Sequence, residues 1–313
     1  MSGYLGLDTS NYTTSAAYWA RGADKPVQAK QLLPVKAGEM GLRQSDAVFH
    51  HTRQLPDVME RLAEAMGGGI AAVAASDRPQ QVEGSYMPCF LVGAGAARQL
   101  GAALGVPVHH FTHQQGHIMA ALTGADCLHL RRAPFLAFHV SGGTTDALLV
   151  EPDADCIIRC RVVGHSLDLK AGQLIDRVGG MLGLPFPAGP ALEQLAAQAQ
   201  STYRVRPTLK GCDCHLSGVE NQCRDRLAAG QPPAEVARFC LDSVCAAVTG
   251  MTEALLMQYG DLPLVYAGGV MSNQMLKQTL TDRFGGHFAP PMYSADNAAG
   301  IACLCKVREE EMG

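Results

Sequence analysis

Charged residues are scarce in this sequence, and basic residues do not outnumber acidic ones. Only 17% of the 313 residues are charged, and 25 Lys and Arg stand against 29 Asp and Glu, for a formal net charge of −4. This balance predicts no broad basic surface for nucleic acid, although a local patch could lie within such an average. The candidates for a local patch are Arg131, Arg132, Arg204, Arg206 and Lys210.

The sequence also lacks the marks of a secreted or membrane protein. It contains no stretch of 18 apolar residues, and its N-terminus has no basic start followed by an apolar segment. Eleven cysteines, an odd number scattered from Cys89 to Cys305, fit reduced thiols better than a disulfide framework. The Cys212/Cys214 and Cys303/Cys305 pairs lack the two-residue gap of zinc knuckles. We therefore expect a cytoplasmic protein with no membrane association.

Hydrophobic residues make up 47% of the chain, enough for two lobes with substantial cores. A strand, a polar turn and a second strand are predicted over 4–19, and the same pattern recurs over 135–150. This repetition indicates an internally duplicated fold whose halves each present a loop to a shared cleft. Charge and a helix breaker at 131–134 predict lobes over 1–130 and 131–295, with a C-terminal helix, 296–313, that packs back on the first lobe.

The other predicted elements are apolar runs or amphipathic periods bounded by Gly, Pro or a capping residue. They are helices over 55–66, 89–105, 174–182, 191–199, 235–256, from 273 onward and 298–308, strands over 70–75, 106–108 and 264–266, and loops over 77–87 and 290–294.

A helical run over 108–122 contains the best candidate metal ligands. His113 and His117 lie four residues apart, so on a helix their imidazoles share one face and could hold one metal ion. Such a pair also occurs on solvated or core faces without a metal. A third ligand has to come from far away in sequence, and Asp296, placed with Asn297 at the cap of the last predicted helix, is the best candidate.

Three turns favour an anion or a nucleotide. The tip of the first hairpin, including Ser10, offers hydroxyls and backbone amides, although an ordinary turn has the same composition. Ser141, Gly142 and Gly143 form the second turn, where successive glycines let backbone amides approach an anion. The third is a strand, a glycine pair and a helix N-terminus at Asn273.

Five motifs, taken together and in order, resemble the TsaD family of tRNA threonylcarbamoyladenosine transferases, once described as O-sialoglycoprotein endopeptidases. They are HxxxH, SGG between strands, GQLIDRVGGMLGLPFPAGPAL, YAGGVMSN and SADNAAGIA, and they span nearly the whole chain. The resemblance implies the duplicated actin/sugar kinase/Hsp70-like α/β fold of ribonuclease H-like lobes. It also implies a nucleotide and a metal held between the lobes.

The resemblance assigns roles residue by residue. It implies that iron or zinc is ligated by His113, His117 and Asp296. The phosphate side would be lined by Ser141, Gly142 and Gly143, the ribose hydroxyls would be held by Asp176, and the nucleotide pocket would be completed by Gly189 and Asn273. Ser10 and Ser141, hydroxyls of the two turns, are the expected catalytic residues.

Several positions depart from the family pattern. The ETSCDET of the first hairpin is replaced by residues 8–14, DTSNYTT, which keep hydroxyls but lose an acidic pair. Thr144 follows SGG in place of His or Asn, residues 84–89 replace a GPG loop, Gln173 replaces the Glu of GEAFDK, and Glu220 replaces the basic residue of SGLK. These changes indicate a divergent paralogue in which metal and nucleotide binding are retained better than the tRNA reaction.

The resemblance implies transfer of a threonylcarbamoyl group from an adenylate to an amine, with a Lewis-acidic metal. Proteolysis is disfavoured, because Gln114 and Gln115 stand where a zincin needs a general base. Two alternatives remain: an ATPase or sugar-kinase-like phosphotransferase, and a non-catalytic nucleotide-binding partner subunit. The expected partners are adenine nucleotide, tRNA, and TsaB-like and TsaE-like proteins.

Overall fold

The computed structural model describes residues 2–10, 12–34 and 42–311. The chain divides into two compact units: unit 1 comprises Met1–Ala133, Glu151–Cys160 and Met292–Gly313, and unit 2 comprises Pro134–Val150 and Arg161–Pro291. Residues 151–160, which the sequence places in the second lobe, belong to unit 1. Gln115 holds this segment, because its Nε2 donates to the carbonyl oxygens of Cys156 at 3.0 Å and Ile158 at 2.8 Å.

Unit 1 is built on a five-stranded sheet in the order β3, β2, β1, β4, β5. These strands are β1 (Gly3–Ser10), β2 (Thr13–Ala20), β3 (Val27–Leu32), β4 (Ile70–Arg78) and β5 (Val108–Thr112). The three first strands are antiparallel neighbours, while β4 and β5 run parallel to β1. The predicted hairpin is confirmed, but its turn is shorter than expected, because residues 8–10 extend β1 and pair with 13–15.

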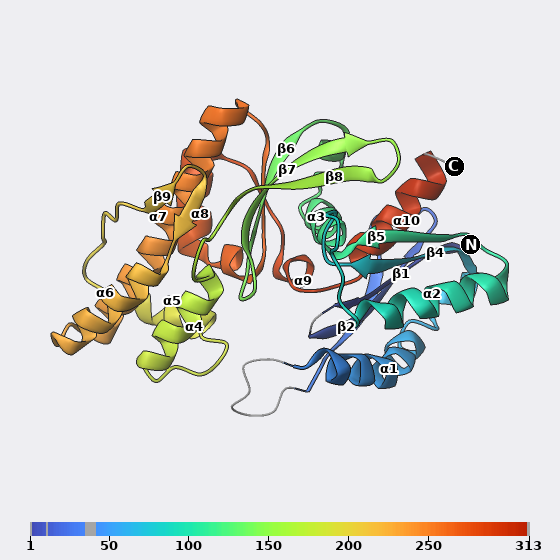
Figure 1. Ribbon diagram of the computed structural model, residues 1–313, viewed down its shortest axis with the longest axis horizontal. Coiled ribbons are helices and arrows are strands. Elements are labelled where there is room, and N and C mark those ends of the chain that lie inside the picture. The colour runs from blue at the N-terminus through green and yellow to red at the C-terminus, as the bar shows by residue number, and fades with distance from the viewer. Residues whose placement is uncertain (1, 11, 35–41, 312–313) are drawn as a thin grey trace. The chain divides into compact units, whose positions relative to one another are not determined.

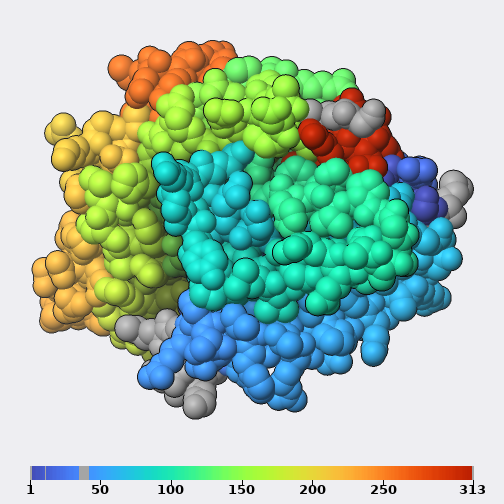
Figure 2. All heavy atoms as spheres, turned by 45° about the vertical axis from the view of Figure 1, so that its right-hand side comes forward, coloured from blue at the N-terminus to red at the C-terminus, as the bar shows by residue number. Residues whose placement is uncertain are grey.

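Helices cover both faces of this sheet (Figure 1). One face carries α1 (Gln44–Glu60) and α2 (Phe90–Leu104), and the other carries α3 (His113–Gly124) and α10 (Ala299–Glu311). Figure 2 shows α1, in blue, and α2, in teal, at the surface of unit 1. The short 3₁₀ turns η1 (Ala65–Gly68) and η2 (Leu128–Arg132) complete the unit.

Two boundaries in unit 1 differ from the predictions. The helix expected over 55–66 begins at Gln44 and ends at Glu60, because Ala47 and His51 in its polar first half are buried. The run expected to be helical from 108 forms β5 up to Thr112. The helix begins at His113, where Thr112 and Gln115 form a reciprocal capping box.

Two glycines allow α10 to approach its neighbours closely. A Cβ on Gly6 of β1 would collide with backbone atoms of Ala298 and Ala302, and one on Gly300 would collide with the carbonyl oxygen of Gly116 in α3. The backbone of α10 therefore lies directly against β1 and α3. This packing brings residue 296, just before α10, to the N-terminal turn of α3.

Unit 2 repeats the architecture of unit 1. Its sheet has the order β12, β11, β6, β7, β8, formed by β6 (Phe135–Val140), β7 (Thr145–Asp153), β8 (Ile157–His165), β11 (Leu264–Ala267) and β12 (His287–Phe288). Here β6 and β7 form the antiparallel hairpin, and β11 and β12 are added in parallel, as β4 and β5 are in unit 1. The matching order confirms the duplicated α/β fold.

The other elements of unit 2 lie mostly between β8 and β11. They are α4 (Ala171–Met181), α5 (Gly189–Ala196), β9 (Thr208–Lys210), β10 (Asp213–His215), α6 (Ser217–Ala228), α7 (Pro233–Tyr259), η3 (Gly269–Ser272) and α8 (Gln274–Phe284). The sequence analysis did not predict β3, β8, β9, β10, α6 or β12. A loop expected over 290–294 is wrong, since Pro291–Ser294 forms the short helix α9.

Helix α7 is long and apolar enough to cross a membrane by length and composition, yet 67% of its most apolar window is buried within the protein. Its side chains Leu241, Val244 and Val248 belong to the large core of unit 2. Burial in this core accounts for its apolar composition.

Candidate functional site

The candidate site of unit 1 lies where three parallel strands end. Asp8 is near the end of β1, Ser76 is near the end of β4, and His113 follows β5 directly. Because β1, β4 and β5 are adjacent and parallel, their carboxyl ends meet at one edge of the sheet. Asp8 and Ser76 are not among the site residues expected from the sequence, although each is a polar residue near the end of an apolar strand.

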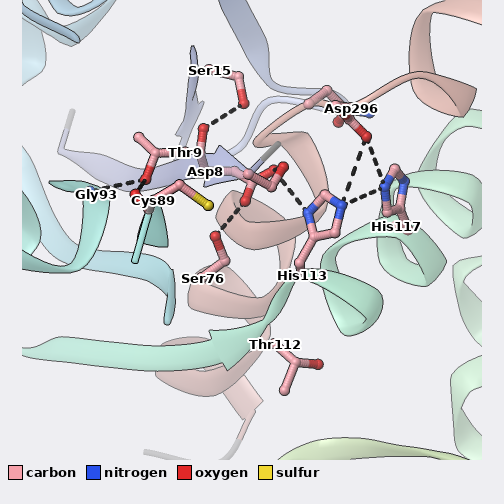
Figure 3. A network of polar contacts seen from close by, with 12 residues as sticks. Asp8, Thr9, Ser15, Ser76, Cys89, Gly93, Thr112, His113, His117 and Asp296 are labelled. Carbon is pink, nitrogen blue, oxygen red and sulfur yellow. Dashed lines mark hydrogen bonds and ion pairs between the residues drawn. The ribbon is translucent and has the colours of Figure 1, made fainter. Parts of the chain in front are cut away.

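His113, His117 and Asp296 converge, as predicted from the sequence (Figure 3). The two Nε2 atoms are 2.9 Å apart, and Asp296 Oδ1 lies 3.1 Å from His117 Nε2 and 3.7 Å from His113 Nε2. Metal–nitrogen bonds of about 2.0–2.1 Å in a tetrahedral zinc site place ligand atoms roughly 3.3 Å apart. The observed spacings therefore fit one transition-metal ion, and two imidazoles with one carboxylate are a donor set that zinc and iron accept.

Asp8 fixes the orientation of His113. Asp8 Oδ2 is 3.0 Å from His113 Nδ1, which leaves Nε2 directed at His117 and Asp296 (Figure 3). Ser76 donates to Oδ1 of Asp8, and Ser10 donates to Oδ2 at 2.9 Å. A carboxylate behind a ligating imidazole selects the tautomer whose other nitrogen faces the metal.

The Asp8–His113 contact shifts the pKa of both groups. Burial alone would raise the pKa of Asp8, but the charge of His113 and its hydrogen bond lower it below the usual range. Burial would likewise lower the pKa of His113, but the Asp8 carboxylate and then Asp296 raise it to about 9. Without a metal, His113 is therefore a cation held between two carboxylates at neutral pH.

The hairpin hydroxyls are buried beside this site. Ser10 is 1% exposed, and its hydroxyl is engaged by Asp8. Thr9 Oγ1 donates to the carbonyl oxygen of Cys89 at 2.9 Å, and Thr14 Oγ1 lies 2.8 Å from Nδ1 of the buried His51. The hairpin therefore hydrogen-bonds to α1 and to the start of α2, in addition to positioning Asp8.

The two residues predicted to cap the last helix have separate contacts. Asn297 Oδ1 accepts from the backbone nitrogen of Ala299 at 3.0 Å, so Asn297 supplies the cap bond. Asp296 instead directs Oδ1 toward the two histidines.

In unit 2 the Ser141–Gly143 turn lies at the N-terminus of α4. The backbone nitrogen of Gly172 donates to the carbonyl oxygen of Ser141 at 3.2 Å, and a Cβ on Gly172 would lie 2.6 Å from backbone atoms of Gly142. Added Cβ atoms on Gly142 and Gly143 would meet nothing within 4 Å. The turn is therefore fixed at its base and open on its outer side, next to a helix N-terminus that favours anions.

The other predicted nucleotide-binding residues lie on α4, α5 and α8, which are linked by hydrogen bonds. Asp176, one turn beyond Gly172, accepts at Oδ1 from the backbone nitrogen of Ala188 at 2.8 Å, and Gly189 follows at the start of α5. Burial raises the pKa of Asp176. Asn273 caps α8 through Leu276, and the next residue, Gln274, donates its backbone N–H to Glu193 of α5.

Two further predictions concern charge. Arg131 and Arg132 pair with Glu311 in unit 1, whereas Arg204, Arg206 and Lys210 lie in unit 2. Glu220, an acid where the resemblance implies a cation, lies between Arg177 at 3.0 Å and Arg224 at 2.9 Å. Its charge is therefore compensated locally.

Sequence comparison identifies relatives across most of the chain. The family model for TsaD, tRNA N6-adenosine threonylcarbamoyltransferase, matches residues 36–303. The chain is 30% identical to the tRNA N6-adenosine threonylcarbamoyltransferase of Methanopyrus kandleri over 84% of this chain and 75% of that protein. It is 31% identical to the protein of the same name from Caulobacter vibrioides over 95% of this chain and 85% of the relative.

Solved structures share the fold at low sequence identity. Component A of the Acidaminococcus fermentans (R)-2-hydroxyglutaryl-CoA dehydratase superposes with a TM-score of 0.57 at 18% identity, over 97% of this chain and 98% of that one. Full-length HypF, in a phosphate- and nucleotide-bound form, gives 0.61 at 12% identity over 99% of this chain and 56% of that one. These neighbours confirm the actin/sugar kinase/Hsp70-like fold. The family model and the two relatives, in turn, show that the chain is a transferase belonging to the TsaD family of tRNA N6-adenosine threonylcarbamoyltransferases.

Proposed function

We propose that this protein transfers a threonylcarbamoyl group from an adenylate to an amine acceptor, the tRNA adenosine named for its relatives. One transition metal, iron or zinc, would be held by His113, His117 and Asp296. The observation that carries the proposal is the convergence of two imidazole nitrogens and one carboxylate oxygen in a chain of this family. The donor atoms come from positions up to 183 residues apart in sequence, yet all lie within 4.8 Å.

A metal bound there would act as a Lewis acid toward the transferred carbonyl group. The protein's own residues prepare the site. Asp8 holds Nδ1 of His113, and Ser10 and Ser76 hold Asp8 in turn. Binding requires His113 to lose the proton that Asp8 and Asp296 favour, so the site exchanges that proton for the metal.

Unit 2 would hold the adenylate. The open Ser141–Gly143 turn offers backbone amides for its phosphate, and Asp176 keeps Oδ1 on Ala188 while Oδ2 serves the ribose hydroxyls. Gly189 and Asn273, joined to Asp176 through α5, would line the nucleoside. Placement by several fixed groups is the main catalytic contribution that such a site makes.

A second candidate function is a non-catalytic nucleotide-binding subunit. The first hairpin lacks the acidic pair of the family, and its remaining acid, Asp8, is engaged by His113, Ser10 and Ser76. Among the described hairpin residues no other carboxylate is available to take a proton from an acceptor amine. This candidate predicts nucleotide and metal binding without turnover.

Incubation of the protein with threonylcarbamoyl-adenylate and tRNA lacking the modification separates the candidates. The transferase predicts modified adenosine in digested tRNA, lost in His113→Ala and His117→Ala. If the nucleotide binds but no product forms even with TsaB-like and TsaE-like proteins present, the result would support a non-catalytic nucleotide-binding subunit. Release of phosphate from ATP that persists in His113→Ala would support an ATPase.

Partner proteins belong to the same proposal. A probable bifunctional tRNA threonylcarbamoyladenosine biosynthesis protein of Methanothermobacter thermautotrophicus is 28% identical over 89% of this chain, which spans 50% of that relative. The other half of that relative lies outside the match. We expect TsaB-like and TsaE-like proteins to act together with this chain, so the transfer assay is to be run with and without them.

A further inference from the structure

Unit 2 contains a cavity of about 370 Å³ that none of the residues discussed for the nucleotide or the metal lines. It lies among the irregular segment before β9, helix α6 and helix α7. This volume is within the range of about 300–1,000 Å³ found for small-molecule sites. The residues that line the cavity include Arg204, Arg206, Gly218, Val219, Arg226 and Phe239.

Three arginines at this cavity have no carboxylate partner among the described residues. Four other arginines of unit 2 have carboxylate partners: Arg177, Arg224, Arg238 and Arg283. By contrast, Arg204, Arg206 and Arg226 line the cavity, and no ion pair joins them to an acid in the part of the chain that the structure describes.

Two acids of α7 already have partners, and a third acid, Asp168, lies 3.3 Å from the lining residue His215. Glu235 accepts from the Tyr203 hydroxyl at 2.9 Å, and Asp242 binds Arg238 at 2.9 Å. Guanidinium groups without carboxylates are suited to a carboxylate or phosphate ligand, which they can bind through paired N–H donors.

The cavity also has an apolar and aromatic wall. The guanidinium of Arg226 lies 3.9 Å from the ring centroid of Phe239 and 5.0 Å from that of Tyr203. This stacking holds the Arg226 cation in place at the wall. Val219 and Ala247 add aliphatic surface, so a ligand has both a cationic rim and an apolar wall to contact.

We propose that this cavity binds a small amphipathic anion, with a carboxylate or phosphate head at Arg204 and Arg206 and an apolar body against Val219, beside the Arg226–Phe239 stack. Helix α6 connects the cavity to the nucleotide-binding residues. Val219 lines the cavity, and its neighbour Glu220 bonds Arg177, which follows Asp176 on α4. A ligand in the cavity that shifts α6 would therefore also shift α4, through the Glu220–Arg177 ion pair.

Calorimetry of the full chain tests this site with three probes: phenyl phosphate, octanoate and inorganic phosphate. We expect saturable binding of phenyl phosphate or octanoate. Inorganic phosphate should bind at least about tenfold more weakly, because it leaves the apolar wall uncovered. The double variant Arg204→Gln/Arg206→Gln should bind the amphipathic probe about tenfold or more weakly than wild type, because charge-assisted hydrogen bonds are lost.

Matched variants keep the test decisive. Arg161→Gln removes an exposed arginine of unit 2 that does not line the cavity, and binding should be unchanged. Gly218→Leu places a side chain in the cavity from a position where an added Cβ meets nothing within 4 Å, so the protein should fold and lose binding.

Unchanged affinity in the double-arginine variant, or no saturable binding of either amphipathic probe, would overturn the proposal. Steeply salt-dependent binding of a single-stranded oligonucleotide that requires the same arginines, without binding of the small probes, would identify an RNA surface and also overturn it.

Discussion

Asp8 Oδ2 and His113 Nδ1 are 3.0 Å apart, although 105 positions separate the two residues in sequence. Asp8 is 1% exposed, so this contact is shielded from water and holds the imidazole in one orientation. It makes the proposed metal site depend on a residue that is not a ligand.

Asp8→Asn should weaken metal binding without removing a ligand. The amide keeps the size of the side chain but loses the charge that orients His113, and loss of such a partner typically costs about 10–100-fold in metal affinity. Competition with a chromogenic chelator measures the zinc affinity of each variant. Asp126→Asn, which removes an exposed acid of unit 1, is the control. Equal affinities of wild type and Asp8→Asn would exclude a role for Asp8.

Asp176 should distinguish ATP from 2′-deoxy-ATP. Loss of charge-assisted hydrogen bonds to ribose costs on the order of 1.5–3 kcal/mol, so the deoxy nucleotide should bind correspondingly more weakly. Asp176→Asn keeps the Oδ1 that accepts from Ala188 and should remove most of that difference. Calorimetry gives all four affinities. If wild type binds both nucleotides equally, Asp176 does not contact the ribose.

The protein should bind tRNA poorly by itself. Each phosphate contact needs a cation, and 25 basic residues stand against 29 acidic ones, with Arg131 and Arg132 already paired with Glu311. Filter binding at two salt concentrations should show affinity weaker than roughly micromolar. Tight, steeply salt-dependent binding, with rescue of a strain depleted of its own TsaD, would contradict this expectation.

His51 should make the protein less stable in mild acid. Burial lowers its pKa from 6.5 to about 4, so between these values the unfolded chain binds more protons than the folded chain. The stabilisation is complete above about pH 6.5 and is lost as the pH falls toward 4.

The loss should reach roughly 2 kcal/mol after allowance for solvent screening. His51→Gln should have lower stability but a flatter pH profile. Urea unfolding of wild type and His51→Gln at about pH 7 and about pH 5 measures how the free energy of unfolding changes with pH in each protein. Identical slopes would show that His51 is not the responsible group.

Gly300→Ala should destabilise unit 1, because the added methyl group collides with the Gly116 carbonyl of α3. Overpacking of this kind costs about 1–3 kcal/mol, and backbone contacts leave little room for relaxation. Gly95→Ala is the matched control, since a Cβ there meets nothing within 4 Å. Thermal unfolding should separate the variants, and an unchanged melting temperature for Gly300→Ala would show that α10 can shift.

The sequence predicted those parts of the molecule whose signal is local. The β1–β2 and β6–β7 hairpins, helix α2 and the buried α7 follow from apolar runs and periodicity. Helix α1 was misplaced at its start, because its first half is polar and becomes ordered by burying Ala47 and His51. The histidine pair was visible from its spacing, whereas Asp8 needed the sheet order that places β1 beside β4 and β4 beside β5.

The Glu220 ion pairs constrain how this chain can change. Reversing Glu220 to Lys alone would set three cations together on α4 and α6, where Arg177 and Arg224 now share one carboxylate. A change of residue 220 from acid to base is therefore expected to cost stability unless Arg177 or Arg224 changes with it, so these three positions are expected to covary. Residue 220 is therefore coupled to two other positions, one of them adjacent to Asp176.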